Sequence, residues 1–142
     1  MRVKLTEHLG DLIADCVRIQ KQAQVDMRAT VRDGIRAGNT LAKDFAKQSA
    51  GAHGKRYPAS MTTEMRPTFR GFERVWPGHS PPPRRRRVRG EYGPDIARPQ
   101  GGMSFEFGSR NQKPHLDLAR SADRIAPSFQ AEVRRLPDKW FW

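Results

Sequence analysis

The sequence predicts an α+β protein with a long N-terminal amphipathic helix, a small antiparallel sheet of about three strands with a long basic loop, and C-terminal helices. Apolar residues with helical spacing run through the first third of the chain. Short β-favouring segments follow, and a second helical stripe begins after Pro114. The chain shows no strand–helix–strand repetition, so an antiparallel sheet is expected. With 142 residues it corresponds to a single domain, residues 1–142.

The first predicted element is a helix, or two nearly continuous helices, over residues 5–48. Apolar residues recur there at steps of three, four and seven, which places them on one face. Gly34 and Gly38 lie on this face at a cost of up to ~1 kcal/mol each relative to Ala, so we expect another helix or sheet to approach closely. A hinge near residue 38 is the alternative. Cys16 is expected in the core. The face comprises Leu9, Leu12, Ile13, Cys16, Ala23, Met27, Val31, Ile35, Leu41, Ala42 and Phe45.

Three strands are expected after the helix. Residues 60–66 and 69–76 are enriched in Thr, Val, Phe and Trp and are separated by a proline break, which predicts two short antiparallel strands. In "MSFEF" (103–107) apolar and polar residues alternate, which is typical of a half-buried strand. We therefore expect Phe105 and Phe107 to face the core beneath the long helix.

A long loop is expected from Pro77 to Gly102, with its extended Arg/Pro-rich part at 78–101. It contains "PPPRRRRVRG" at 81–90. Residues 51–90 carry ten Lys/Arg and two Asp/Glu, so +8 of the net charge of +12 lies in this part of the chain. Candidate contacts with DNA or with a partner are Arg84, Arg85, Arg86, Arg87 and Arg89. Basic side chains of this kind contact phosphates without reading sequence.

The C-terminal region predicts helices that end in an aromatic tail. A stripe of Leu116, Ala119, Ala122, Ile125 and Ala126 continues through Phe129, Val133 and Leu136. Pro127 is expected to kink or restart the helix, and Pro137 to stop it. The tail, 137–142, ends in Trp140, Phe141 and Trp142, aromatic residues that often anchor interfaces. Docking on a neighbouring subunit and folding back over the chain's own long helix are both open.

No catalytic, metal or cofactor site is predicted. The four histidines are scattered, one cysteine excludes an internal disulfide, and no phosphate-binding loop or nucleophile motif occurs. A nuclease site could be assembled from His115 and Asp117 with Glu91, Asp95 and Glu106 nearby. Such residues at a helix start are more commonly capping residues. The sequence therefore favours a protein that is not an enzyme. No segment approaches the ~20 apolar residues of a membrane span, so no membrane partner is expected.

The segment "EYGPDIARPQGGMSFEFGSRNQKPHLDLARSADRIAPSFQAEV" (91–133) resembles the end of a family of small tail-component, or neck, proteins of long-tailed bacteriophages, the gene-product-ten-like family of lambdoid phages. In that family a strand ending in glycine precedes a polar loop and a helix that starts at a proline. The corresponding residues here are 105–109, 110–113 and 114–116. Upstream, "YPASMTTEMRP" and "GFERVWPG" are similar to the first two strands. "HGKRYPAS" departs from the family signature, and the arginine loop and "KWFW" are local elaborations.

The resemblance implies a structural protein of the phage head–tail junction: a neck connector, tail-completion or tail-terminator ring that joins the head to the tail tube around the DNA channel. It implies a homo-oligomeric ring, commonly a hexamer, with other neck proteins and the tail tube protein as partners. Its location would be the neck or tail of a virion assembled in the host cytoplasm. The arginines would then meet either an adjacent ring or DNA in the channel.

Two other classes of protein remain open. A small basic nucleic-acid-binding protein would contact the phosphate backbone through the arginine-rich loop. A phage-encoded nuclease or assembly factor absent from the virion is the third possibility.

Overall fold

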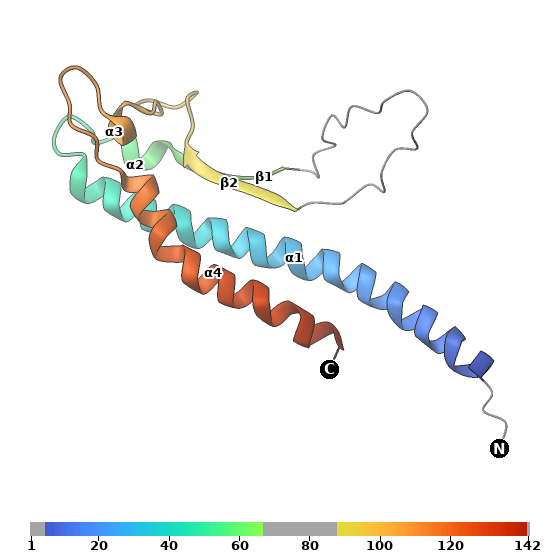
Figure 1. Ribbon diagram of the computed structural model, residues 1–142. Helices are drawn as coiled ribbons and strands as arrows, with labels where there is room; N and C mark the ends of the chain where they lie inside the picture. Colours follow the sequence, from blue (N-terminus) through green and yellow to red (C-terminus); the bar gives the residue numbers. More distant parts are fainter. Residues whose placement is uncertain (1–4, 67–87, 142) are drawn as a thin grey trace, which may run out of the picture.

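The computed structural model describes residues 5–66 and 88–141. Helix α1 (Leu5–Ser49) is the longest element described, and helix α4 (Asp117–Phe141) runs antiparallel beside it (Figure 1). A ribbon of two strands, β1 (Met61–Arg66) and β2 (Arg89–Pro94), also packs on α1. Two short helices, α2 (Tyr57–Ser60) and α3 (Ser104–Phe107), lie near the C-terminal end of α1. The predicted α+β class, the long N-terminal helix and the antiparallel sheet are confirmed.

Helix α1 uses two of its faces for packing. Val31 and Ile35 lie against Gly90 of β2, while Gly34 lies against Phe129 of α4. At 100° per residue, these contacts fall on neighbouring parts of the helix surface. The amphipathic pattern that predicts the helix therefore serves both a sheet and a second helix.

Close approach explains the two glycines of α1. A Cβ on Gly34 would lie 2.6 Å from the Phe129 ring, and one on Gly38 would lie 2.6 Å from the Tyr92 ring. Each distance is far shorter than an ordinary carbon–carbon contact. The prediction that these glycines admit another helix or sheet is confirmed, and α1 continues through residue 38 without a break.

Strands β1 and β2 pair antiparallel from Met61 opposite Pro94 to Arg66 opposite Arg89. The first predicted strand, 60–66, is confirmed. The loop prediction is wrong at residues 89–94, because this part of the basic segment is β2. The predicted strand at 69–76 lies outside the described residues. Within the described ranges the sheet has two strands, one fewer than expected.

The third predicted strand is wrong. Residues Ser104–Phe107 form helix α3, in which the Phe107 N–H donates to the Met103 carbonyl, and Gly108 ends it with a φ of 82°. Phe105 is buried as expected, but Phe107 is 69% exposed. In a helical turn, residues two apart point in different directions, so only one of the two rings reaches the core.

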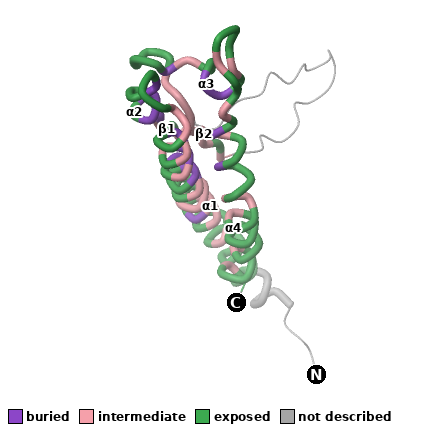
Figure 2. Tube along the Cα trace, turned by 90° about the vertical axis from the view of Figure 1, so that its left-hand side faces the viewer, coloured by how far each residue is buried: buried purple, intermediate pink, exposed green. Residues whose placement is uncertain are grey.

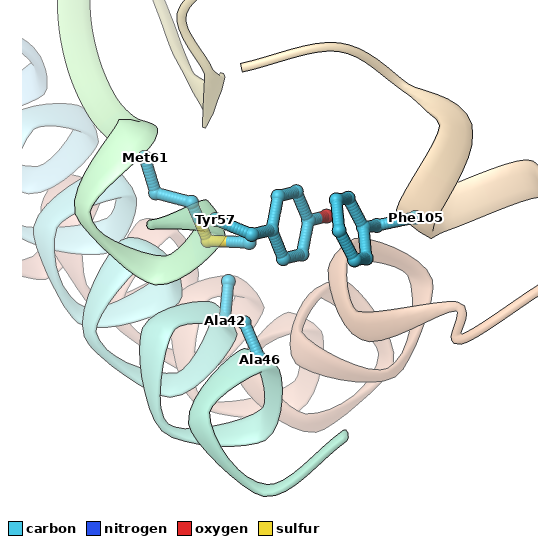
Figure 3. Packing of buried hydrophobic residues seen from close by; sticks show 5 residues of the cluster. All are labelled: Ala42, Ala46, Tyr57, Met61 and Phe105. Atoms are coloured by element: carbon cyan, nitrogen blue, oxygen red, sulfur yellow. The ribbon is translucent and has the colours of Figure 1, made fainter. Parts of the chain in front are cut away.

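The core is small and lies where the short helices meet α1. The Phe105 ring stacks on the Tyr57 ring, with centroids 4.4 Å apart (Figure 3). Met61 and two alanines of α1, Ala42 and Ala46, complete the cluster. Alanine keeps the helix surface flat, which lets the Tyr57 ring lie directly over α1.

Helix α4 departs from prediction at both ends. It begins at Asp117, so Leu116 precedes it, exposed and with a φ of 55°. It also continues past Pro137 to Phe141, so the expected stop is wrong and the described part of the 137–142 tail is helical. Each proline removes one backbone hydrogen bond to the residue four before it. The two residues concerned, Asp123 and Val133, are exposed, so water can satisfy their carbonyls.

The N-terminal part of α1 extends beyond α4, because the last residues of α4 lie beside Asp26. Most of the outward surface of α4 is also exposed (Figure 2). Because α4 does not reach the N-terminal part of α1, Leu12, Ile13 and Val17 are exposed. Cys16 is exposed too, which corrects its expected place in the core.

Candidate interaction surfaces

Asp117, at the start of α4, is the centre of a buried polar cluster. Its Oδ2 accepts a 2.7 Å hydrogen bond from the Ser49 hydroxyl at the end of α1. Its side chain is fully buried, with His115 Nδ1 3.9 Å from Oδ2 and Arg120 Nη1 3.9 Å from Oδ1. Since Ser49 and Asp117 are 68 residues apart in the chain, this contact fixes the start of α4 against the end of α1.

Glu106 caps α4 from outside the helix. Its two carboxylate oxygens accept from the backbone N–H groups of Leu118 and Ala119, at 2.9 and 3.0 Å. These N–H groups lack partners within the helix, and a negative charge at a helix N-terminus is favourable. Glu106 therefore acts as a structural group here.

Tyr57 is buried beside these carboxylates. Burial, and then the charges of Glu106 and Asp117, raise the pKa of its phenol above the ordinary value. Tyr57 is therefore neutral, and its ring serves the core through its stack on Phe105.

Asp26 holds the C-terminal end of α4 against α1. It accepts hydrogen bonds from Lys139 Nζ at 2.8 Å and from Trp140 Nε1 at 2.9 Å. Gln22, one turn earlier in α1, donates to it at 3.1 Å. The hydrogen bonds from Lys139 and Trp140 lower the pKa of Asp26. Trp140 thus contacts its own chain, in agreement with the folded-back alternative, whereas Phe141 is 63% exposed. Trp142 lies outside the described residues.

Of the five arginines predicted to contact DNA or a partner, Arg89 is the one that lies within the described residues. Arg89 is the first residue of β2, is exposed, and forms an ion pair with Glu91 two residues later. Residues i and i+2 of a strand share a face, which brings these two side chains together. Arg84, Arg85, Arg86 and Arg87 lie outside the described residues.

A shallow groove of about 500 Å³ lies between β2, α1 and α4. Its lining includes Ile35 of α1, Tyr92 of β2 and Leu118 of α4. The Tyr92 hydroxyl is 2.9 Å from the Ser121 hydroxyl, which ties β2 to α4. Sequence patterns do not indicate this groove, because its residues come from three separate segments.

Within residues 5–66 and 88–141, no cluster of three or more His, Cys, Asp or Glu side chains could hold a metal ion. None of the helices in these ranges combines the length and apolar character needed to cross a lipid bilayer.

Comparison with protein-family models, with curated proteins and with solved structures finds no match to this chain. The functional assignment therefore depends on the chain's own residues and on the resemblance given above.

Proposed function

We propose that this protein is a structural component of the head–tail junction of a long-tailed bacteriophage, acting in a homo-oligomeric ring around the DNA channel. The long amphipathic helix, the strand at 61–66 and the C-terminal helix occur in the order that the resemblance implies, whereas the glycine-ended strand that it places at 105–109 is helix α3 here. A connector, a tail-completion protein and a tail terminator are equally compatible with this arrangement.

The observation that carries the proposal is the large apolar surface left uncovered within a single chain. Among the described residues, the buried hydrophobic cluster has five members, two of them alanine. Large apolar side chains are exposed at both ends of the α1–α4 pair: Leu12, Ile13 and Phe141 at one end, and Leu116 at the other. Extended apolar surfaces mark sites of protein association. A ring gives every subunit the same neighbours, so one chain can cover these surfaces repeatedly.

The groove beside β2 supports the same proposal. It is lined by Tyr92 of β2 and by Leu118 of α4, and β2 is an outer strand of the sheet among the described residues. An outer strand has backbone groups available for pairing with another chain. A segment of the next subunit in the ring is the occupant that the proposal assigns to this groove.

The test is the position of the protein in purified phage particles. Immunogold labelling with an antibody against this chain should mark the junction between head and tail in electron micrographs. Particles that infect normally and contain none of this chain would contradict the proposal.

The alternative function is that of a small basic nucleic-acid-binding protein. The net charge of +12 favours it. Purified protein that binds free DNA tightly as a monomer, and is absent from particles, would support this alternative over the ring.

A further inference from the structure

One face of α1 is strongly basic and lies beside the two packed faces. We call it the basic face of α1; it comprises Arg18, Lys21, Arg28, Arg32, Arg36, Lys43 and Lys47. At 100° per residue, these side chains fall within an arc of about 100°. Ile35 and Gly34, which contact the sheet and α4, lie on the remainder of the circumference, whereas Asn39 and Ala46 lie within the arc and are buried.

The cations of this face are open to solvent, and most are not neutralised. All are exposed except Lys43, which is half-buried. Three of the seven form ion pairs with acids of α1 itself: Arg18 with Asp15, Arg32 with Asp33, and Lys47 with Asp44. The other four, Lys21, Arg28, Arg36 and Lys43, form no ion pair with any residue in the described ranges.

The arrangement opposes helix stability when no ligand is present. Arg28, Arg32 and Arg36 follow one another at four-residue spacing, as do Lys43 and Lys47. Like charges at this spacing repel and destabilise a helix. A polyanion along the same face would turn this repulsion into attraction.

We propose that the basic face of α1 binds the phosphate backbone of double-stranded DNA without reading its sequence. From Arg18 to Lys47 the face is about 43 Å long at 1.5 Å per residue, and duplex DNA offers a dense, continuous row of charge over that distance. Protein interfaces have apolar or aromatic residues at their centres. Val25 is the only large apolar residue within this arc, so DNA is the favoured partner over an acidic protein surface.

This surface is separate from the arginine run at 84–89. It deepens the DNA contact within the proposed function, since a ring around the channel would present one such face per subunit. The binding itself does not require the ring, and the test uses free DNA and the full-length chain. Failure of DNA binding and failure of ring formation are therefore separate results.

The experiment compares two variants that lose the same charge. The first replaces Lys21, Arg28, Arg36 and Lys43 with Gln, which retains a good helix former at each position. The control replaces Arg110, Lys113, Arg134 and Arg135, all exposed, with Gln. Binding to a random-sequence duplex is measured by fluorescence anisotropy from 50 to 200 mM salt, and circular dichroism melts verify folding.

The slope of log affinity against log salt is negative, and its magnitude should be about 3 to 4 smaller for the first variant than for wild type. Each of the four lost phosphate contacts contributes about 0.9 to that magnitude. The control should retain the wild-type slope. The melting temperature of the first variant should equal or exceed that of wild type, since like-charge repulsion along the basic face of α1 has been reduced. Equal slopes for both variants, or wild-type protein that does not bind duplex DNA, would overturn the proposal.

Discussion

Asp26 and Trp140 meet across 114 positions of the chain, and the indole Nε1 donates a 2.9 Å hydrogen bond to Oδ2 of the buried carboxylate. At the other end of the helix pair, Ser49 donates to Asp117. The two contacts fix α4 against α1 at both of its ends. Between them the helices leave a shallow cavity of about 310 Å³ beside Gly34 and Phe129. Polar contacts at the ends and the close approach of Gly34 to Phe129 together hold the two helices against each other.

The Asp26 contact should make stability depend on acid pH. Folding lowers the pKa of Asp26 below 3.8, so below about pH 4 the unfolded chain binds more protons than the folded one. The ionised Asp26 carboxylate contributes its full stabilisation above about pH 4, and this stabilisation is lost as pH falls through the folded-state pKa of Asp26. Asp26→Asn should lower Tm at pH 6, and the difference from wild type should narrow towards pH 3.

Asp33→Asn is the matched control, since Asp33 is exposed and pairs only with its neighbour Arg32 among the described residues. It should melt close to wild type at pH 6. A constant gap between Asp26→Asn and wild type across this pH range would show that the carboxylate charge is not what holds α4.

The two phenylalanines of α3 should differ sharply. Phe105→Ala removes a buried ring stacked on Tyr57 and should cost about 3–5 kcal/mol. Phe107→Ala removes an exposed ring and should change stability by about 0.5 kcal/mol or less. Urea unfolding of both variants measures the difference. Similar losses would mean that α3 packs with a different face.

Removing the cap of α4 should destabilise the protein without creating a large cavity. Glu106→Ala leaves the N–H groups of Leu118 and Ala119 without their acceptor, which should cost about 1–3 kcal/mol in chemical unfolding. Glu132→Ala removes an exposed carboxylate of the same helix and should cost about 0.5 kcal/mol or less. Equal effects would argue against the capping role.

Two glycines of α1 should respond in opposite directions to alanine. Gly10 has open space around it, so Gly10→Ala should stabilise by up to about 1 kcal/mol. At Gly38 the new methyl meets the Tyr92 ring, which is held through its hydroxyl by Ser121. Overpacking of this kind costs about 1–3 kcal/mol and outweighs the helix gain. A more stable Gly38→Ala variant would show that β2 can move away from α1.

The elements that sequence predicts correctly are those with long or strongly patterned segments. Helix α1 repeats its apolar spacing over many turns, and β1 combines Thr-rich composition with nearby proline. Strand β2 was missed because "RGEYGP" has weak strand propensity. It is held by pairing with β1 and by Tyr92 against Gly38, which are contacts between distant segments. The five-residue alternation of "MSFEF" was too short to separate a strand from one helical turn.

The candidate sites were predicted less well for a related reason. The sequence predicts sites at consecutive arginines and consecutive aromatic residues. The candidate surfaces in the structure instead combine residues spaced along a helix or residues from distant parts of the chain. Lys21, Arg28, Arg36 and Lys43 are scattered in the sequence but share a helix face. Helical periodicity applied to charged residues, as it was to apolar ones, could have identified the basic face of α1. The Asp26–Trp140 contact has no local signal at all.

The most direct test of the central claim is the mass of the purified full-length chain, measured by native mass spectrometry over a range of protein concentrations. The exposed apolar ends of the α1–α4 pair and the groove beside β2 predict a closed oligomer. A hexamer would have about six times the 16.2 kDa of one chain, with ring-shaped particles in electron micrographs of the same sample. A mass of 16.2 kDa at every concentration, with no rings, would contradict the account.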